Sequence, residues 1–211
     1  MELRQASKNL CEDITDASKT GNVLEVASLL KKYNDNPAQY DSDAFGGLIT
    51  NAFWRSCEYG HVECTKKLHG LMLNRKERLG YGLEAACIRG HANIVKFLIP
   101  ILKLEECLDV SKTLMKSIQG GSIDIVKMVL PHVKNRVTRT KGLREACKSN
   151  NQAIFDLLYP LSNPQSALDF MEKSNTPGIE MLRDEMARQQ RVVLSEAVGE
   201  VSAKPVRKNK I

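Results

Sequence analysis

The chain repeats itself, and this repetition limits its fold more than any other feature. Five segments align without a gap, and they begin at Ala17, Ser56, Ala86, Ser117 and Ala146. Each segment has a small turn-forming residue at the same place, which we call the hinge: Gly21, Gly60, Gly90, Gly121 and Asn150. Hinges that recur roughly every 30 to 40 residues are typical of stacked supersecondary units, each burying one face against the next.

Apolar and small residues recur at fixed positions on both sides of the hinge. Positions seven, four and three residues before it lie on one face of a helix, and they hold Ile, Leu, Phe, Ala, Ser or Cys in every copy. Positions five and eight residues after it are apolar in almost every copy, which predicts a second helix. Ten residues after four of the hinges stands a helix breaker, namely Gly70, Pro100, Pro131 or Pro160. Each unit is therefore expected to be a helix, a tight turn and a second helix.

One copy carries a family resemblance. The run Gly-His-x-x-Ile-Val-Lys-x-Leu from Gly90 to Leu98, preceded by Ala86-Cys87, resembles the middle of an ankyrin repeat, and Gly60-His61 and Gly121 to Lys127 match parts of it. The resemblance covers roughly residues 13–160. It implies an all-α, ankyrin-like solenoid of about five to six stacked helix-turn-helix repeats. No unit has the family's Thr-Pro-Leu-His start or its Gly-Ala-Asp-x-Asn ending, which favours short loops over β-hairpin fingers.

The repeats set the expected domain organisation. We expect a repeat domain over residues 1–183, with units near 13–33, 49–73, 80–102, 111–133 and 140–161 and a degenerate cap at 166–183. Residues 1–12 are expected to form a short cap or leading helix, and residues 34–47 the longest connector. Residues 184–211 should form a C-terminal helix and a basic, disordered tail, because the last ten residues are mostly polar or charged.

Composition favours an ordinary globular protein. Apolar residues make up 42% of the chain and charged residues 27%. No apolar run approaches the ~18 residues that a transmembrane helix needs, and the N-terminus lacks the apolar stretch of a signal peptide. We therefore expect a monomeric, cytoplasmic protein without a transmembrane segment. A nuclear location and delivery into a host cell cytosol are the alternatives.

Neither the cysteines nor the histidines predict catalysis. Cys57, Cys87 and Cys147 occupy one repeat position, and no CxxC pair is present, so we expect inert core thiols in a reduced chain. His61 and His91 each follow a hinge, and stacked units would keep them apart, so we expect each to hydrogen-bond across its own turn. Phosphate-loop, nucleophile-elbow and zinc-protease motifs are missing from the sequence. The chain is expected not to be an enzyme, and no catalytic, metal or cofactor residue is assigned.

Variation between the copies points to a binding surface. The resemblance implies that partners dock on a concave face lined by the first helices and the connectors. The candidate partner-binding residues at matching positions are Trp54, Glu58, Tyr59, Glu84, Ile88, Arg89, Met115, Arg144 and Lys148. Trp54, Tyr59 and Arg89 would form the centre, because Trp, Tyr and Arg dominate interface energies. Alternatively, Trp54 covers the core beneath the long first connector.

Two basic stretches, 74–81 and 134–141, are predicted to be connectors on one edge of the stack. Their candidate residues are Arg75, Lys76, Arg78, Lys134, Arg136, Arg139 and Lys141. They favour a partner protein with an acidic segment. Binding of nucleic acid or an anionic surface is the less favoured alternative, because the 134–141 run has no aromatic residue. A solvated surface without a partner is a third interpretation. The sequence thus predicts a non-catalytic protein-interaction module, such as a scaffold, a regulator or an effector of an intracellular bacterium.

Overall fold

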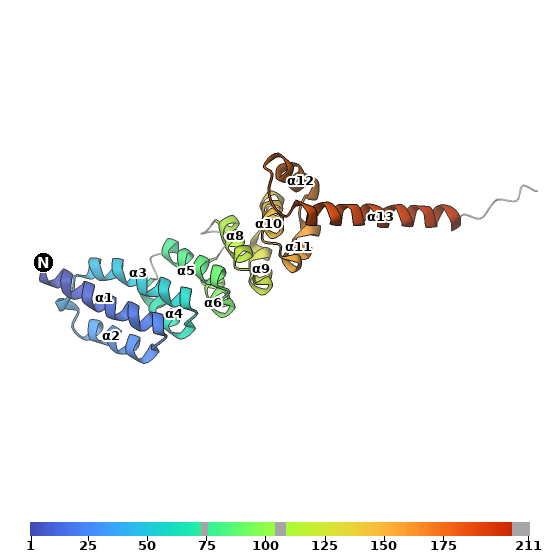
Figure 1. Ribbon diagram of the computed structural model, residues 1–211. Helices are drawn as coiled ribbons and strands as arrows, with labels where there is room; N and C mark the ends of the chain where they lie inside the picture. The colour runs from blue at the N-terminus through green and yellow to red at the C-terminus, as the bar shows by residue number, and fades with distance from the viewer. Residues whose placement is uncertain (73–75, 104–108, 204–211) are drawn as a thin grey trace, which may run out of the picture. The chain divides into compact units, whose positions relative to one another are not determined.

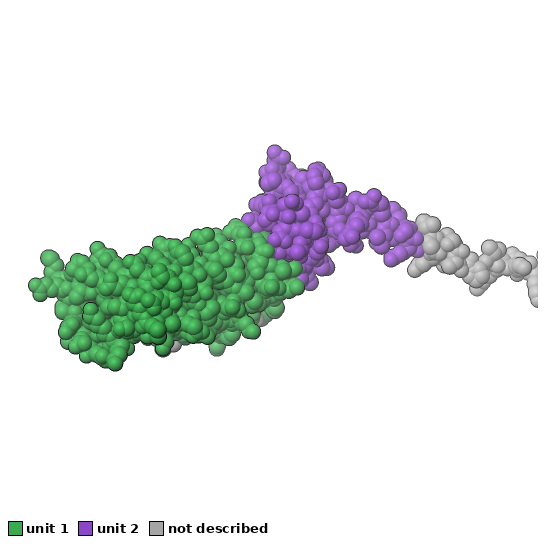
Figure 2. All heavy atoms as spheres, turned by 60° about the horizontal axis from the view of Figure 1, so that its bottom comes forward, with its two compact units in different colours: residues 1–138 green, residues 139–211 purple. Residues whose placement is uncertain are grey.

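The computed structural model of the 211-residue chain describes residues 1–72, 76–103 and 109–203 (Figure 1). These three ranges form α-helices, short 3-10 helices and turns, and they contain no β-strand. The all-α prediction is therefore confirmed for them. The chain divides into two compact units, residues 1–138 and 139–211, which Figure 2 shows in green and purple.

The described residues of the first unit contain four helix pairs and the start of another helix. The pairs are α1 (Glu2–Thr20) with α2 (Val23–Asp35), α3 (Ser42–Tyr59) with α4 (Val62–His69), α5 (Lys76–Arg89) with α6 (Ala92–Leu102), and α8 (Val110–Gln119) with α9 (Ile123–Val129). The first helices contact one another in the order α1, α3, α5, α8, and the second helices in the order α2, α4, α6, α9. The pairs therefore form two layers, a first-helix layer and a second-helix layer (Figure 1).

The repeated positions supply the core, as predicted. The residues seven positions before the hinges are completely buried, and they are Ile14, Phe53, Leu83, Leu114 and Leu143. The small residues four positions before the hinges are buried too, which lets neighbouring helices approach closely. Leu29, eight residues after the first hinge, is the exception because it stays half-buried.

The hinges also behave as predicted. Their φ angles lie between 50° at Asn150 and 86° at Gly60. This left-handed conformation ends a helix, and glycine and asparagine adopt it more readily than other residues do. Each of the five hinges therefore ends a first helix and starts the turn into the second.

The first helices begin earlier than the sequence predicted. Residues 2–12 are the opening turns of α1 and not a separate cap. Helix α3 begins at Ser42, inside the predicted 34–47 connector, which also contains the end of α2 and a 3-10 helix, Pro37–Gln39. Asp41 explains this start, because its carboxylate accepts hydrogen bonds from the backbone N–H groups of Asp43 and Ala44 at 3.1 and 2.9 Å.

Both basic stretches were wrongly predicted to be connectors. Helix α5 begins at Lys76 and α10 (Arg136–Lys148) at Arg136, so most of the two stretches is helical. In α5 the buried face continues one turn before Leu83, to Leu79, which is only 3% exposed. Burial of this extra turn explains why the helix starts early. Arg75 lies outside the described residues.

The predicted breakers act differently from one another. Gly70, Pro131 and Pro160 lie in 3-10 helices that follow the second helices, Gly70–Met72, Leu130–His132 and Tyr159–Leu161. Pro100 lies inside α6, and the helix continues for two more residues. Leu102, which is 1% exposed, anchors this last part of the helix in the core.

The second unit contains most of α10, then α11 (Gln152–Leu158), α12 (Pro164–Lys173) and α13 (Ile179–Ala203). The predicted cap at 166–183 covers most of α12 and the start of α13, whose Leu182 is fully buried. The predicted boundary between 183 and 184 falls inside α13, because the helix continues without a break through this point. The C-terminal helix is therefore present, and the predicted tail lies mostly outside the described residues. None of the described helices is both long and apolar enough to cross a membrane.

Candidate functional site

A groove of about 880 Å³ lies on the first-helix layer of the first unit. Helix α5 forms its centre, because α5 contacts both α3 and α8. The lining residues are Gly47, Leu48, Thr50, Asn51, Trp54 and Glu58 from α3, Arg78, Tyr81, Glu84, Ala85, Ile88 and Arg89 from α5, and Lys112 and Lys116 from α8. We call this the central groove.

The central groove contains several of the predicted partner-binding residues, namely Trp54, Glu58, Glu84, Ile88 and Arg89. Tyr59 is exposed and Met115 is half-buried, but neither lines the groove. Trp54 is half-buried in the groove wall, with the Arg55 guanidinium 4.4 Å from its ring centroid. This position favours the binding interpretation of Trp54 over a covering role beneath the connector.

Sequence reasoning missed the residues nine positions before the hinge. Asn51, Tyr81 and Lys112 occupy this position on α3, α5 and α8, and all three line the groove. They lie one turn before the candidate residues six positions before the hinge, and therefore on the same helix face. Following that face backward along each helix would have identified them.

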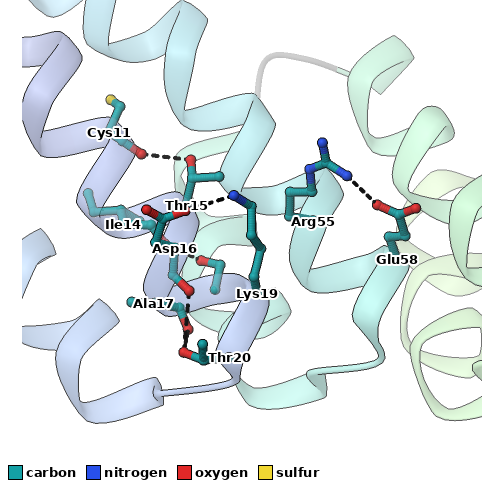
Figure 3. Close-up of polar contacts among 10 residues, drawn as sticks. Cys11, Ile14, Thr15, Asp16, Ala17, Lys19, Thr20, Arg55 and Glu58 are labelled. Carbon is teal, nitrogen blue, oxygen red and sulfur yellow. Dashed lines mark hydrogen bonds and ion pairs between the residues drawn. The ribbon is translucent and has the colours of Figure 1, made fainter.

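Glu58 joins two helices through two arginines. Arg55 Nη1 on the same helix donates to Glu58 Oε2 at 2.7 Å (Figure 3), and Arg89 Nη2 on α5 donates to Glu58 Oε1 at 2.8 Å. The hydrogen bond from Arg89, followed by the one from Arg55, lowers the pKa of Glu58. The lowered pKa keeps the carboxylate ionised at neutral pH, and the two arginines hold this side chain, which is only 13% exposed, in place. Arg89 is thus part of the groove wall.

A second ion pair joins α5 to α8. Lys112 Nζ lies 2.8 Å from Glu84 Oε2, and the hydrogen bond to Glu84 raises the pKa of Lys112. The ammonium group also lies 5.4 Å from the ring centroid of Tyr81, at cation–π distance. Both carboxylates of the groove are therefore neutralised by cations that line it.

Two further cations of the groove have no carboxylate partner among the described residues. Arg78 makes a long hydrogen bond to Thr50 Oγ1 at 3.5 Å, and Lys116 one to Gln119 Oε1 at 3.4 Å. Arg78, Arg89, Lys112 and Lys116 outnumber Glu58 and Glu84, so the groove carries excess positive charge. It should attract negatively charged groups.

Among the side chains that the structure describes, the remaining candidate cations do not line the groove. Lys134 and Arg136 belong to the first unit, and Arg139, Lys141, Arg144 and Lys148 to the second. In the second unit, the Arg144 guanidinium lies 3.7 Å from the ring centroid of Phe170, and Lys148 lies 3.6 Å from Glu145. Arg144 therefore has an evident packing role. The side chain of Lys76 lies outside the described part of the chain.

The hinge histidines link successive helix pairs. His61 Nε2 donates to the backbone oxygen of Lys19 at 2.9 Å, and His91 Nε2 donates to that of Glu58 at 2.8 Å. The prediction that each bonds across its own turn was wrong, because stacking places the end of the preceding first helix within reach of the ring. Both rings therefore hold one helix pair against the previous one.

The cysteines at the repeat position are buried thiols. Burial raises the pKa of Cys57 and Cys87 to about 12 and that of Cys147 to about 11. A thiol with such a pKa is protonated at neutral pH and is a poor nucleophile. Among the described residues, no group of three His, Cys, Asp or Glu side chains is placed to hold a metal ion.

No family model matches the chain, and no curated protein shows significant similarity to it. The central groove therefore carries the functional inference.

Proposed function

We propose that the first unit is an ankyrin-like stack whose central groove binds a segment of a partner protein without catalysing a reaction. Four helix pairs in two layers, with left-handed hinges, support the ankyrin-like architecture. The groove lies on the first-helix layer, which is the layer that the resemblance assigns to partner binding.

One observation carries the proposal: apolar side chains are exposed together inside a charged rim. Leu48, Tyr81 and Ile88 are exposed large apolar residues, and all three line the groove beside the half-buried Trp54. An aromatic and aliphatic centre surrounded by charged groups is the usual anatomy of a protein interface.

The ion pairs make this surface preorganised. Glu58 is fixed by two arginines, and Glu84 is fixed by Lys112, so the walls contributed by α3, α5 and α8 are tied together. A surface that is already ordered loses little conformational entropy when a partner docks. This supports binding by a largely rigid groove.

Binding of nucleic acid is supported less well. Trp54 and Tyr81 could stack on bases, but the exposed Leu48 and Ile88 line the same groove and offer the phosphates of a strand no partner. A mobility-shift assay with single-stranded and duplex probes at low salt tests this alternative. We expect no shift, whereas tight binding that falls steeply with added salt would favour nucleic acid over a protein.

Affinity capture from a cell lysate, followed by mass spectrometry, tests the proposed function. We compare the wild type, the double variant Trp54→Ala/Tyr81→Ala, and Tyr59→Ala as a matched control. Tyr59 and Tyr81 are 50% and 56% exposed, but only Tyr81 lines the groove. Proteins captured by the wild type and the control should be lost from the folded double variant. Retention of the same proteins by the double variant would refute the groove as the binding site.

A further inference from the structure

A second hollow continues the central groove toward α1. It has a volume of about 530 Å³ and is lined by Met1, by Arg4, Gln5 and Lys8 of α1, and by Asp43, Ala44, Gly47 and Leu48 of α3. Gly47 and Leu48 line both hollows. The two hollows therefore adjoin at these two residues, and we call the pair, which spans α1, α3, α5 and α8, the extended groove.

Charge and apolar surface are distributed unevenly along the extended groove. Arg4 and Lys8 on α1, together with the carboxylate of Asp43 on α3, form one end, and Lys112 and Lys116 on α8 form the other. Leu48, Trp54, Tyr81 and Ile88 lie on α3 and α5, the helices between these ends. The exposed Arg78 lies in this middle part as well. Cations thus outnumber carboxylates at both ends, while the large exposed apolar side chains of α3 and α5 lie in the middle.

Cations at both ends remain available for a ligand. Neither Arg4 nor Lys116 forms an ion pair within the described ranges, and the pair of Lys8 with Glu12 is long, at 3.8 Å, and exposed. Of the acidic residues in the middle, Glu58 and Glu84 are already paired with cations. A carboxylate arriving at either end would therefore gain a partner.

The spacing of the helices gives the length of the ligand. Packed helices lie about 8–10 Å apart, so the three spacings from α1 to α8 amount to about 24–30 Å. An extended chain advances about 3.3 Å per residue, so about seven to nine residues cross the groove.

We propose that the extended groove binds an extended peptide segment of about nine residues with acidic residues near both ends and apolar residues in the middle. This inference rests on the proposed function and specifies its partner. A nucleic-acid strand fits less well, because it carries a phosphate at every nucleotide, including those that would lie over the apolar middle.

Selection from a phage-displayed library of random nine-residue peptides, with the full chain as bait, tests the inference. We expect enriched peptides to have Asp or Glu near both ends and Leu, Phe or Tyr in the middle. A synthetic fluorescein-labelled copy of an enriched peptide without tryptophan then gives dissociation constants by anisotropy.

Charge reversal at the two ends is the decisive comparison. Arg4→Glu/Lys116→Glu should weaken binding of this peptide about tenfold or more. The matched control is Lys96→Glu/Lys127→Glu, which changes the net charge equally at exposed lysines on α6 and α9, in the second-helix layer. The control should change affinity less than about threefold. Equal losses in the two variants would mean that only net charge matters, and this would overturn the inference.

Failure of this inference can be told apart from failure of the proposed function. Enrichment of neutral or basic peptides that need Trp54 and Tyr81 overturns the acidic-peptide inference and leaves groove binding intact. Absence of enriched peptides also overturns the inference, while the capture experiment still decides the proposed function. Unchanged binding of the enriched peptides to Trp54→Ala/Tyr81→Ala contradicts both.

Discussion

At the scale of single residues, the hinge glycines meet two separate requirements. Gly60 has a φ of 86°, which an L-residue with a side chain adopts at a cost. A Cβ atom at Gly60 would also lie 2.7 Å from Nδ1 and Cε1 of His91, whose ring is held by its bond to Glu58. At Gly90, with a φ of 79°, a Cβ would meet open space. A comparison of Gly60 with Gly90 therefore separates the cost of backbone strain from the cost of crowding between helix pairs.

We predict that Gly60→Ala lowers the free energy of unfolding more than Gly90→Ala does. The left-handed conformation alone costs about 1–2 kcal/mol, which applies to both variants. Gly60→Ala must in addition displace the His91 ring and weaken its hydrogen bond, at a further cost of about 1 kcal/mol. Urea unfolding of both variants gives the comparison.

The variant His91→Ser provides the control for this prediction, because Ser122 occupies the same position in the fourth copy. In the His91→Ser background the extra cost of Gly60→Ala should disappear. Equal destabilisation by the two glycine variants in the wild-type background would contradict the role assigned to His91.

The small residue four positions before the hinge gives a second residue-scale prediction. Ala86 is completely buried, so Ala86→Leu should overpack the core and cost about 1–3 kcal/mol. Thermal unfolding measures this cost. Ala153→Leu, at an exposed position on α11, is the matched control and should be nearly neutral. If Ala86→Leu were as stable as the wild type, the proposed register of the repeat would be wrong.

At the scale of helices, the start of α3 depends on one carboxylate. Asp41 accepts hydrogen bonds from two backbone N–H groups that would otherwise lack partners. Asp41→Ala should lower the free energy of unfolding by about 1 kcal/mol. Asp41→Asn should lose much less stability, because an amide oxygen can also accept the capping hydrogen bonds. Denaturant unfolding distinguishes the variants. If both variants lost the same free energy of unfolding, the cap would act through the negative charge of Asp41 instead.

The sequence predicted the hinges and the core of each helix pair but placed the starts of the first helices too late. The five copies agree near the hinge, where packing constrains every unit in the same way. A further buried position lies eleven residues before the hinge, at Leu10, Ile49 and Leu79. The corresponding residue in α10 is Arg139, so the pattern weakens there and the helical turns were taken for connectors.

At the scale of the whole molecule, the groove depends on contacts that no single repeat contains. The ion pair between Arg89 and Glu58 joins two helix pairs, and so does the hydrogen bond from His61 to Lys19. The resemblance to ankyrin repeats placed the candidate residues on the first helices, but it did not indicate which side chains from α3, α5 and α8 meet in the groove. For that reason Tyr59 was included among the predicted partner-binding residues and Tyr81 was missed. The sequence placed both basic stretches on one edge of the stack, but the 134–141 stretch is divided between the two compact units after Thr138.

The central claim is that a partner segment lies over the apolar middle of the groove. Trp54 is the only tryptophan of the chain and lines this part. Its fluorescence therefore reports on the groove alone, provided that the ligand contains no tryptophan. A ligand that covers the half-buried indole removes water from it, and this should shift its emission to shorter wavelengths.

The most direct test is a titration of the full chain with the enriched nine-residue peptide, monitored by Trp54 emission. We predict a saturable shift to shorter wavelengths, with the same dissociation constant as the anisotropy of the labelled peptide gives. Saturable binding by anisotropy without any change in Trp54 emission would place the peptide elsewhere and contradict the account.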